Sequence, residues 1–559
     1  MPPLSATILA DLSPLRTALL LAVPMLYLLV AASTAVPGAA RPAPWRFARW
    51  AAGAAVAAAL LSLLGLLAGG PALLRGPTLL NLGDLGALRL GLRADAAGLT
   101  LLLLASALGG VIVAYSHTAL AGERGQRRYL RRLALTLAAV SLLAVANNLL
   151  LLAATWVGTS LALHGLLTFY RERPAALIAA HKKFIASRAA DLCLLAAIAL
   201  LAHTLGTLEI DEATTRARAM SSAGLPPALQ AAALLIAICA LLKCAQLPLH
   251  GWLLQVMEAP TPVSALLHAG VVNLGGFLLI RLGSLVADVP AAQTLLVVVG
   301  SITAVVAAGV TMTRISIKLA LAWSTCAQMG FMLLQCGLGL HSLALMHLVG
   351  HSIYKAHAFL GAGGAVADRR RRQLSTPPPA AGLLACWLGA LAGAAIVTVA
   401  GLAFGLRPAE APGLWAMGGV LALALAPLLT RVSGSTAVGL WRLAGPAAAI
   451  AVTLAYFGLH ALFERWLGPS DLGAATHPAL VIWILACFGA LFALQVAVRA
   501  RPESALARRL HPLLFAGLHL DERFTRWSFR LWPLRLPASA PQSMAEPGRT
   551  PPSTTPGAC

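Results

Sequence analysis

Long apolar segments alternate with short polar ones along most of the chain. An apolar run of about 20 residues crosses the ~30 Å hydrocarbon core of a bilayer as an α-helix. About fifteen such segments occur, so the pattern predicts an all-α polytopic membrane protein with about 14–15 transmembrane helices. The predicted segments are residues 14–36, 49–69, 98–115, 131–146, 148–170, 184–203, 228–249, 262–286, 293–310, 317–337, 341–366, 380–405, 412–431, 443–463 and 478–498.

The same pattern divides the chain into five regions. Residues 1–116 contain three predicted transmembrane helices and a loop rich in Gly, Leu and Arg, and residues 117–366 contain the segments with titratable residues. Residues 367–500 hold further apolar segments without a lysine, which is typical of a scaffold. Aromatic residues and arginines at helical spacing predict that residues 501–536 lie in the membrane interface or dock a partner subunit. Residues 537–559, rich in Pro, Ser and Thr, are typical of a disordered tail.

The composition fits a membrane protein. Hydrophobic residues make up 59% of the chain and charged residues 11%, which excludes a soluble globular protein, where charged residues approach a quarter of the total. The net charge of +22 comes from arginines in loops, so membrane orientation explains it and we expect no nucleic-acid partner. Basic residues are more frequent after odd-numbered helices, which places the N-terminus outside and the C-terminus in the cytoplasm.

The eight cysteines form no C-x-x-C pair and mostly lie in apolar segments. They are therefore interpreted as small hydrophobic residues, and they predict neither a disulfide framework nor a zinc or iron–sulfur site. We expect this chain to hold no metal and no cofactor.

Lysine is rare in this sequence and confined to its middle. Only five of the 41 basic residues are lysines, and the remainder are arginines. Arginine keeps its proton in proteins, whereas a buried lysine can lose one, so this distribution indicates a proton path. The alternative is that a few lysines cluster by chance. The five are Lys182, Lys183, Lys243, Lys318 and Lys355.

Lys243 lies in an apolar segment, five residues before Pro248. A proline inside a helix removes a backbone hydrogen bond, and a break at membrane depth is tolerated where it is buried in protein or lines a hydrated cavity. The sequence therefore predicts that Lys243 faces water inside the membrane and takes part in ion translocation. Glu258 and His268 follow as further candidates in the same part of the chain.

Three titratable residues share one stripe of a predicted helix. His347, His351 and Lys355 are spaced four residues apart, which places them on one helical face. Histidine titrates near neutrality and can pass a proton on, so the stripe predicts a proton relay. Lys318, in the preceding apolar segment, is another candidate. His164 is the only titratable residue of its segment, where a role in the relay and a role in packing both stay open.

Arg188 and Asp191 form a candidate charge pair. They are three residues apart, so they share a helix face and can neutralise each other in the membrane. Such a pair marks an ion pathway or clamps the structure, and both interpretations stay open. Lys182 and Lys183 lie where this segment begins, and we expect their side chains to reach the membrane surface.

Three sequence blocks carry a resemblance to a known superfamily. The blocks LLKCAQLPLHGWLLQVMEAPTPVSALLHAG, IKLALAWSTCAQMGFMLLQCGLG and HLVGHSIYKAHAFL resemble the antiporter-like membrane subunits of respiratory complex I and the Mrp-type cation/proton antiporters, over roughly residues 95–366. The resemblance implies two inverted five-helix repeats with broken helices and a row of titratable residues at the membrane midplane. The matching positions are Lys243 in the broken helix, His268 after the TPVSAL motif, His347, His351 and Lys355 in the second-half relay, and Arg188 and Asp191 in an R-x-x-D motif.

The sequence departs from this superfamily in the fifth helix. Antiporter-like subunits carry a glutamate there, in a G-W-E-G-like setting, that pairs with the lysine of the broken helix. Here the corresponding text is TWVGTSL, which places Val157 at that position. The chain also has no lysine after Lys355 and lacks the long lateral helix. We therefore expect Arg188, Asp191 and Glu258 to be the candidate charge partners that replace the glutamate.

A narrower resemblance is to the DabB family. The segments WVGTSLALHGLLTFY, KKFIASRAADLCLL, AQMGFMLLQCGLG, SIYKAHAFL and LDERFTRWSFRLWP carry it. It implies a membrane subunit of an inorganic-carbon accumulation system in the bacterial inner membrane. It also implies a large soluble DabA-like partner at the cytoplasmic face, which resembles a β-carbonic anhydrase and holds the zinc. Proton or sodium flow would then drive CO2 hydration to bicarbonate.

Two alternative functions stay open. The first is a stand-alone or complex I-type antiporter subunit, against which Val157 counts. The second is a membrane anchor whose charged residues have no transport role.

Overall fold

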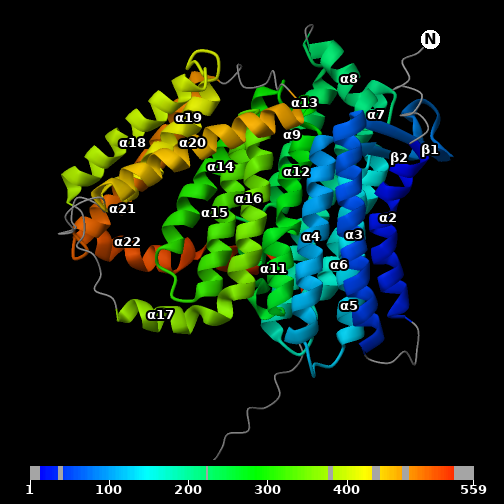
Figure 1. Cartoon of the computed structure of the whole chain (residues 1–559), viewed down its shortest axis with the longest axis horizontal. Helices are drawn as coiled ribbons and strands as arrows, with labels where there is room; N and C mark the ends of the chain where they lie inside the picture. Colours follow the sequence, from blue (N-terminus) through cyan, green and yellow to red (C-terminus); the bar gives the residue numbers. More distant parts are fainter. Residues whose placement is uncertain are drawn as a thin grey trace, which may run out of the picture.

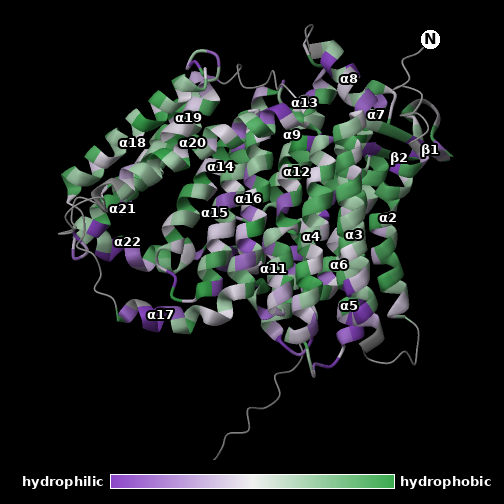
Figure 2. Cartoon of the chain, viewed as in Figure 1, coloured by the Kyte–Doolittle hydropathy of each residue, from purple (hydrophilic) through white to green (hydrophobic). Residues whose placement is uncertain are grey.

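The computed structural model describes residues 13–35, 42–221, 224–374, 382–430, 441–468 and 477–533. Almost all of this part is helical, and most of the long helices run side by side (Figure 1). Figure 2 shows apolar residues along the bodies of these helices, with polar residues concentrated toward their ends. Twelve segments of the described part are long and apolar enough to cross a membrane. The predicted all-α polytopic membrane fold is confirmed.

Eleven of these segments are single helices and one is interrupted. The interrupted segment consists of α11 (Thr261–Ala269), the short η3 (Val271–Asn273) and α12 (Leu274–Arg281). The single helices are α2 (Ser13–Ser33), α3 (Pro42–Gly69), α4 (Ala96–Ala119), α6 (Leu149–Leu167), α7 (Pro174–Leu205), α14 (Pro290–Thr311), α15 (Ile317–Gly337), α18 (Leu383–Ala403), α19 (Pro412–Thr430), α20 (Trp441–Leu467) and α21 (Pro478–Ala500).

Three further helices occupy predicted transmembrane positions. The helix α5 (Gln126–Val145) carries four arginines in its first two turns, and α16 (His341–Leu360) carries the stripe of histidines and lysine. The helix α9 (Pro227–Lys243) is shorter because it ends at the break before Pro248. With these three, each of the fifteen predicted segments contains a helix. The relation of two inverted repeats stays a prediction.

The backbone is broken directly after Lys243. An irregular stretch that contains Pro248 leads from α9 to α10 (Gly251–Leu254) and η2 (Gln255–Glu258). Ala245 already adopts the left-handed region, with φ of 52°, so the chain leaves the helix before the proline. Pro248 has no N–H to continue the ladder of hydrogen bonds. The predicted broken helix is therefore confirmed, with Lys243 as its last residue.

A two-stranded antiparallel hairpin replaces the loop predicted between the second and third helices. It pairs β1 (Ala72–Asn81) with β2 (Ala87–Ala94), and the short η1 (Gly83–Leu85) joins them. Leucines alternate with arginine or glycine in β2, and half-buried and exposed positions alternate in the first half of β1, a period of two that suits a half-buried strand. We predicted a loop because the glycines and arginines obscured this short alternation.

Polar elements lie at two opposite ends of the helical body (Figure 2). One end, called here the hairpin end, holds the β-hairpin, α8 (Ile210–Ser221) and α13 (Gly283–Val286). The other, called here the basic end, holds the starts of α5 and α7, η4 (Gly361–Gly364) and the arginine-rich α17 (Ala365–Gln373). The positive-inside rule predicts that the basic end faces the cytoplasm.

The C-terminal part of the described chain lies across the long helices and is called here the strap (residues 505–533). It contains α22 (Ala505–Phe515), η5 (Gly517–His519) and α23 (Leu520–Leu531). Arg314, in the loop between α14 and α15, donates to the carbonyl oxygens of Leu514 at 2.8 Å and Phe515 at 2.6 Å. The strap therefore packs on the protein as a helical segment, while residues 537–559 lie outside the described residues.

Candidate ion-translocation site

Lys243 is buried at the end of α9. Its Nζ has no hydrogen-bond partner among the described residues and lies 4.3 Å from the centroid of the Trp156 ring, on α6. A desolvated cation over an aromatic face gains about 2 kcal/mol or more. This ammonium is therefore held by a ring face and by electrostatics, with no direct ion pair to any described residue.

The carboxylate that acts most strongly on Lys243 is Asp191, from α7. Asp191 forms an ion pair with Arg188 at 2.7 Å, one turn away on the same helix. This is the pair expected from their spacing. Because Arg188 is partly exposed while Asp191 is buried, the pair brings one carboxylate to the broken helix without leaving its charge uncompensated.

Glu258 lies elsewhere. Its carboxylate is 3.8 Å from the guanidinium of Arg173, and both side chains are about half exposed. Val157, where the resemblance predicts a missing glutamate, directly follows Trp156 in α6. The described structure thus brings Asp191, rather than Glu258, to the neighbourhood of Lys243.

Lys182 and Lys183 are both buried, so the expectation that they reach the membrane surface was wrong. Lys183 Nζ donates to the carbonyl oxygen and hydroxyl of Ser160 at 2.6 and 2.8 Å, and its charge acts on His164. Lys182 Nζ forms an ion pair with Asp521 of the strap at 2.6 Å. The restriction of lysine to one part of the chain was the signal that pointed to both residues.

The residues around Lys243 are called here the first lysine cluster: Lys183, Arg188, Asp191 and Lys243.

A second lysine cluster forms around α16. The buried Lys355 donates to the carbonyl oxygen of Leu321 at 2.9 Å and to the hydroxyl of Ser324, both on α15. These are neutral acceptors. Within the described residues no carboxylate forms an ion pair with Lys355, in contrast to the arginine-backed Asp191 near Lys243.

The histidines of the predicted stripe adjoin His268. His351 Nε2 lies 3.2 Å from the carbonyl oxygen of His268, and the rings of His347 and His351 are 5.9 Å apart. His268 stacks on Phe359 at 4.4 Å, and neither of its ring nitrogens has a partner in the part of the chain that is described. The described structure therefore brings His268, His347, His351 and Lys355 together.

Lys318 lies apart from both clusters, near the basic end. Its Nζ donates to Thr261 Oγ1 at 2.9 Å. It lines a cavity of about 270 Å³ together with Glu258, Arg173 and Tyr170. Lys318 lies on α15, the same helix that supplies the hydrogen-bond acceptors of Lys355.

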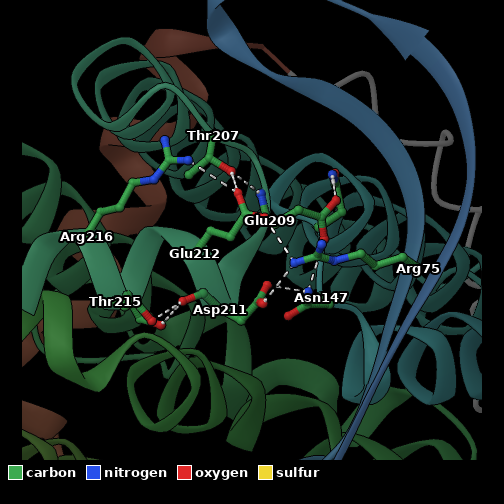
Figure 3. A network of polar contacts seen from close by, with 10 residues as sticks. Arg75, Asn147, Thr207, Glu209, Asp211, Glu212, Thr215 and Arg216 are labelled. Carbon is green, nitrogen blue, oxygen red and sulfur yellow. Dashed lines mark hydrogen bonds and ion pairs between the residues drawn. The ribbon is translucent and has the colours of Figure 1, made fainter.

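A polar network at the hairpin end was not predicted (Figure 3). The buried Glu209 accepts hydrogen bonds from the side-chain amides of Asn147 at 3.0 Å and Asn148 at 3.1 Å. Burial raises the pKa of the Glu209 carboxyl, against the opposing effect of these amides. Arg75 of the hairpin pairs with Glu212 at 3.1 Å. Nothing in the local sequence identified this network, because its members come from three separate polar segments.

The region predicted as scaffold also contains a buried titratable residue. His460, on α20, lies 3.4 Å from the hydroxyl of Ser342 and 3.8 Å from the carboxylate of Glu464. Within the described residues, no group of three or more His, Cys, Asp or Glu side chains is arranged to hold a metal ion.

The broken helix and the two lysine clusters define a membrane subunit of the antiporter-like class. The sequence model of the family "NADH:quinone oxidoreductase/Mrp antiporter, TM" matches residues 146–377, which hold both clusters. Among solved structures, the Mrp complex from Dietzia sp. DQ12-45-1b superposes with a TM-score of 0.59 at 23% identity. That alignment covers 93% of this chain and 59% of that chain, and it establishes similarity of fold alone.

Two curated relatives give a narrower identification. The chain is 40% identical to the probable inorganic carbon transporter subunit DabB of Hydrogenovibrio crunogenus, over 76% of this chain and 80% of the relative. It is 38% identical to the probable inorganic carbon transporter subunit DabB2 of Halothiobacillus neapolitanus, over 94% and 96%. The chain belongs to the DabB family, which confirms the resemblance predicted from its motifs.

Proposed function

We propose that this chain is the cation-conducting membrane subunit of an energy-coupled inorganic-carbon pump in the bacterial inner membrane. Cation flow through its buried titratable residues drives CO2 hydration in a large soluble DabA-like partner at the cytoplasmic face. The observation that carries the proposal is the position of Lys243, buried at a helix break beside the Arg188–Asp191 pair. An ionisable group at such a break is expensive to bury, which favours a functional role.

In this proposal Lys243 is the residue of the first lysine cluster that takes up and releases the proton. Its ammonium is stabilised by Asp191 and by the ring of Trp156, but no hydrogen bond fixes it within the described residues. A change in the charge of a neighbour therefore alters its tendency to hold a proton. Lys183 is such a neighbour, because its positive charge opposes that of Lys243.

In the second half, Lys355 and the histidines form the relay. Among the described residues, the hydrogen-bond acceptors of Lys355 are neutral, so it can lose its proton without leaving an unpaired carboxylate behind. The next proton acceptors are the ring nitrogens of His268, which have no partner among the described residues, and the pair His347–His351. The ring of His268 stacks on that of Phe359. His164 and Lys318 are proposed access residues on the basic side, where both line cavities.

The chemistry of the buried residues favours the proton over sodium. Amines and imidazoles can take up and release protons, whereas sodium is a hard cation that takes oxygen ligands. Three buried or partly buried cations, Lys183, Lys243 and Arg188, adjoin the single carboxylate of Asp191, so a sodium ion there is repelled. A membrane potential of 100 mV contributes about 2.3 kcal/mol per charge moved, enough to bias hydration more than tenfold.

Purification from the native membrane tests the proposed partner. The proposal predicts that a large, zinc-containing, carbonic-anhydrase-like subunit co-purifies in near-stoichiometric amount after mild solubilisation. NADH dehydrogenase or Mrp-type subunits in its place would support the second candidate, an antiporter or complex I-type proton-pumping subunit. The family-model match favours that second candidate, whereas Val157, in place of the glutamate, counts against it.

A further inference from the structure

A cavity of about 460 Å³ opens at the basic end, between α5, α6 and the start of α7. This volume lies in the range of small-molecule binding sites. Its polar lining is formed by Arg132, His164, Thr168 and Arg171, and its apolar lining includes Leu161 and Leu177. Leu161 is 45% exposed on a membrane-crossing helix, so one wall of the cavity faces the bilayer.

The two arginines of this cavity have no acidic partner. Neither the guanidinium of Arg132 nor that of Arg171 forms a hydrogen bond or ion pair with any residue that the structure describes, whereas Arg173, two residues beyond Arg171, pairs with Glu258. The side chain of Arg132 packs against Gly165, where a Cβ atom would collide with it. Two unneutralised guanidinium groups thus line one cavity.

We propose that this cavity binds the phosphate group of an anionic phospholipid. Guanidinium groups bind phosphate oxygens through short, paired hydrogen bonds, and basic pockets between transmembrane helices on the cytoplasmic side bind anionic headgroups. A free phosphate ion offers the same oxygens to Arg132 and Arg171. The apolar wall of Leu161 and Leu177 favours the lipid, because an acyl chain covers this wall and a free ion does not.

The cavity also reaches the first lysine cluster. His164 lines it, and the charges of Lys183, Arg188 and Arg132 all act on this histidine. A phosphate held by Arg132 and Arg171 places negative charge beside His164 and offsets these three cations. This consequence rests on the proposed function: the bound lipid makes it easier for a proton to enter the first lysine cluster.

Lipid titration of the full chain, purified with its partner and delipidated in detergent, tests the binding. Native mass spectrometry with phosphatidylglycerol is expected to detect one retained lipid per chain in the wild type. The Arg132→Gln/Arg171→Gln variant is expected to bind it about tenfold or more weakly, because two charge-assisted contacts are lost. The control Arg49→Gln/Arg131→Gln removes two exposed charges from the same end and is expected to bind as the wild type does.

Three outcomes would overturn the lipid assignment. They are equal affinity in the wild type and the Arg132→Gln/Arg171→Gln variant, equal weakening in the control, and displacement of the lipid by inorganic phosphate at comparable concentration. If the double variant does not fold, the single variant Arg171→Gln is used. Arg171 is exposed and unpaired within the described residues, and its loss is expected to weaken binding several-fold.

Transport in vesicles separates this inference from the proposed function. Adding phosphatidylglycerol to phosphatidylcholine vesicles is expected to raise proton uptake several-fold for the wild type and not for the Arg132→Gln/Arg171→Gln variant. Uptake that responds equally in both contradicts the functional consequence. If neither the wild type nor the variant moves protons in any vesicle, the proposed function is wrong. The lipid titration then still tests the binding site independently.

Discussion

The two lysine clusters stabilise a buried lysine side chain with different partners. Lys243 has an arginine-backed carboxylate and an aromatic face nearby but no hydrogen bond among the described residues. Lys355 has two hydrogen bonds to neutral oxygens and no carboxylate partner in the described part of the chain. A nearby anion favours the charged form of a lysine, whereas neutral acceptors in an apolar setting favour it less. The first cluster is therefore suited to hold a proton and the second to release one.

The largest expected effect comes from replacing Lys243 by arginine. The Lys243→Arg variant keeps the positive charge beside Asp191 but cannot release a proton at physiological pH. We expect carbon uptake in a complementation assay to fall to background, with normal membrane levels and normal recovery of the partner. Near wild-type uptake would mean that Lys243 is only a structural counter-charge and would remove the basis of the comparison.

A smaller loss is expected for Asp191→Asn. This change removes the carboxylate near Lys243 and leaves Arg188 unpaired, at a cost of roughly 2–3 kcal/mol for a charged partner. Uptake is expected to fall by about 30- to 100-fold, while the exposed acid variant Glu172→Gln keeps wild-type uptake. The double variant Val157→Glu/Asp191→Asn returns an acid to the position used by antiporter-like subunits, and we expect it to recover part of the activity. Full activity of Asp191→Asn would show that the first cluster needs no acid.

The strap contacts both α7, through Lys182, and the loop between α14 and α15, through Arg314. Asp521 pairs with the fully buried Lys182 and accepts from Gln255 at 3.1 Å, so Asp521→Asn leaves a buried cation without its anion. Removing one partner of such a pair costs of order 3 kcal/mol, which is expected to lower the thermal unfolding temperature of the purified complex by several degrees. Glu522→Gln removes an exposed charge from the same helical turn and is the matched control. Equal melting temperatures of the two variants would contradict a stabilising role for the Lys182–Asp521 pair.

The smallest expected effect is that of Ser324→Ala in the second cluster. Lys355 then keeps the carbonyl oxygen of Leu321 as its remaining acceptor, so about 1 kcal/mol is lost and uptake changes by about fivefold or less. The control is Ser62→Ala. Ser62 is a buried serine of α3 whose hydroxyl donates to the carbonyl oxygen of Ala58. A loss as large as that of Asp191→Asn would mean that the two lysines depend equally on their partners.

Much of the fold could be predicted from the lengths of the apolar segments and from the position of a proline. Each predicted segment contains a helix, and Pro248 marked the break after Lys243, because segment length and proline chemistry are local properties. The stripe of His347, His351 and Lys355 was equally local. The hairpin was missed because its alternation of leucine with arginine is short.

Contacts between distant parts of the chain could not be predicted from the sequence. The ion pair of Lys182 joins residues 339 positions apart, and Asp521 has no local feature that marks it as a partner of α7. Of the two candidate acids, Asp191 is distinguished from Glu258 only by helix packing. The network around Glu209 likewise depends on how the hairpin folds onto α8.

The most direct test of the account is proton movement in vesicles that contain the purified complex of this chain and its partner. An internal pH dye follows proton flow under an imposed membrane potential, with and without CO2, for the wild type and Lys243→Arg. The account predicts that CO2 stimulates proton flow in the wild type and that Lys243→Arg abolishes both the flow and its response to CO2. Proton flow that is unchanged in Lys243→Arg, or that ignores CO2 in the wild type, would contradict it.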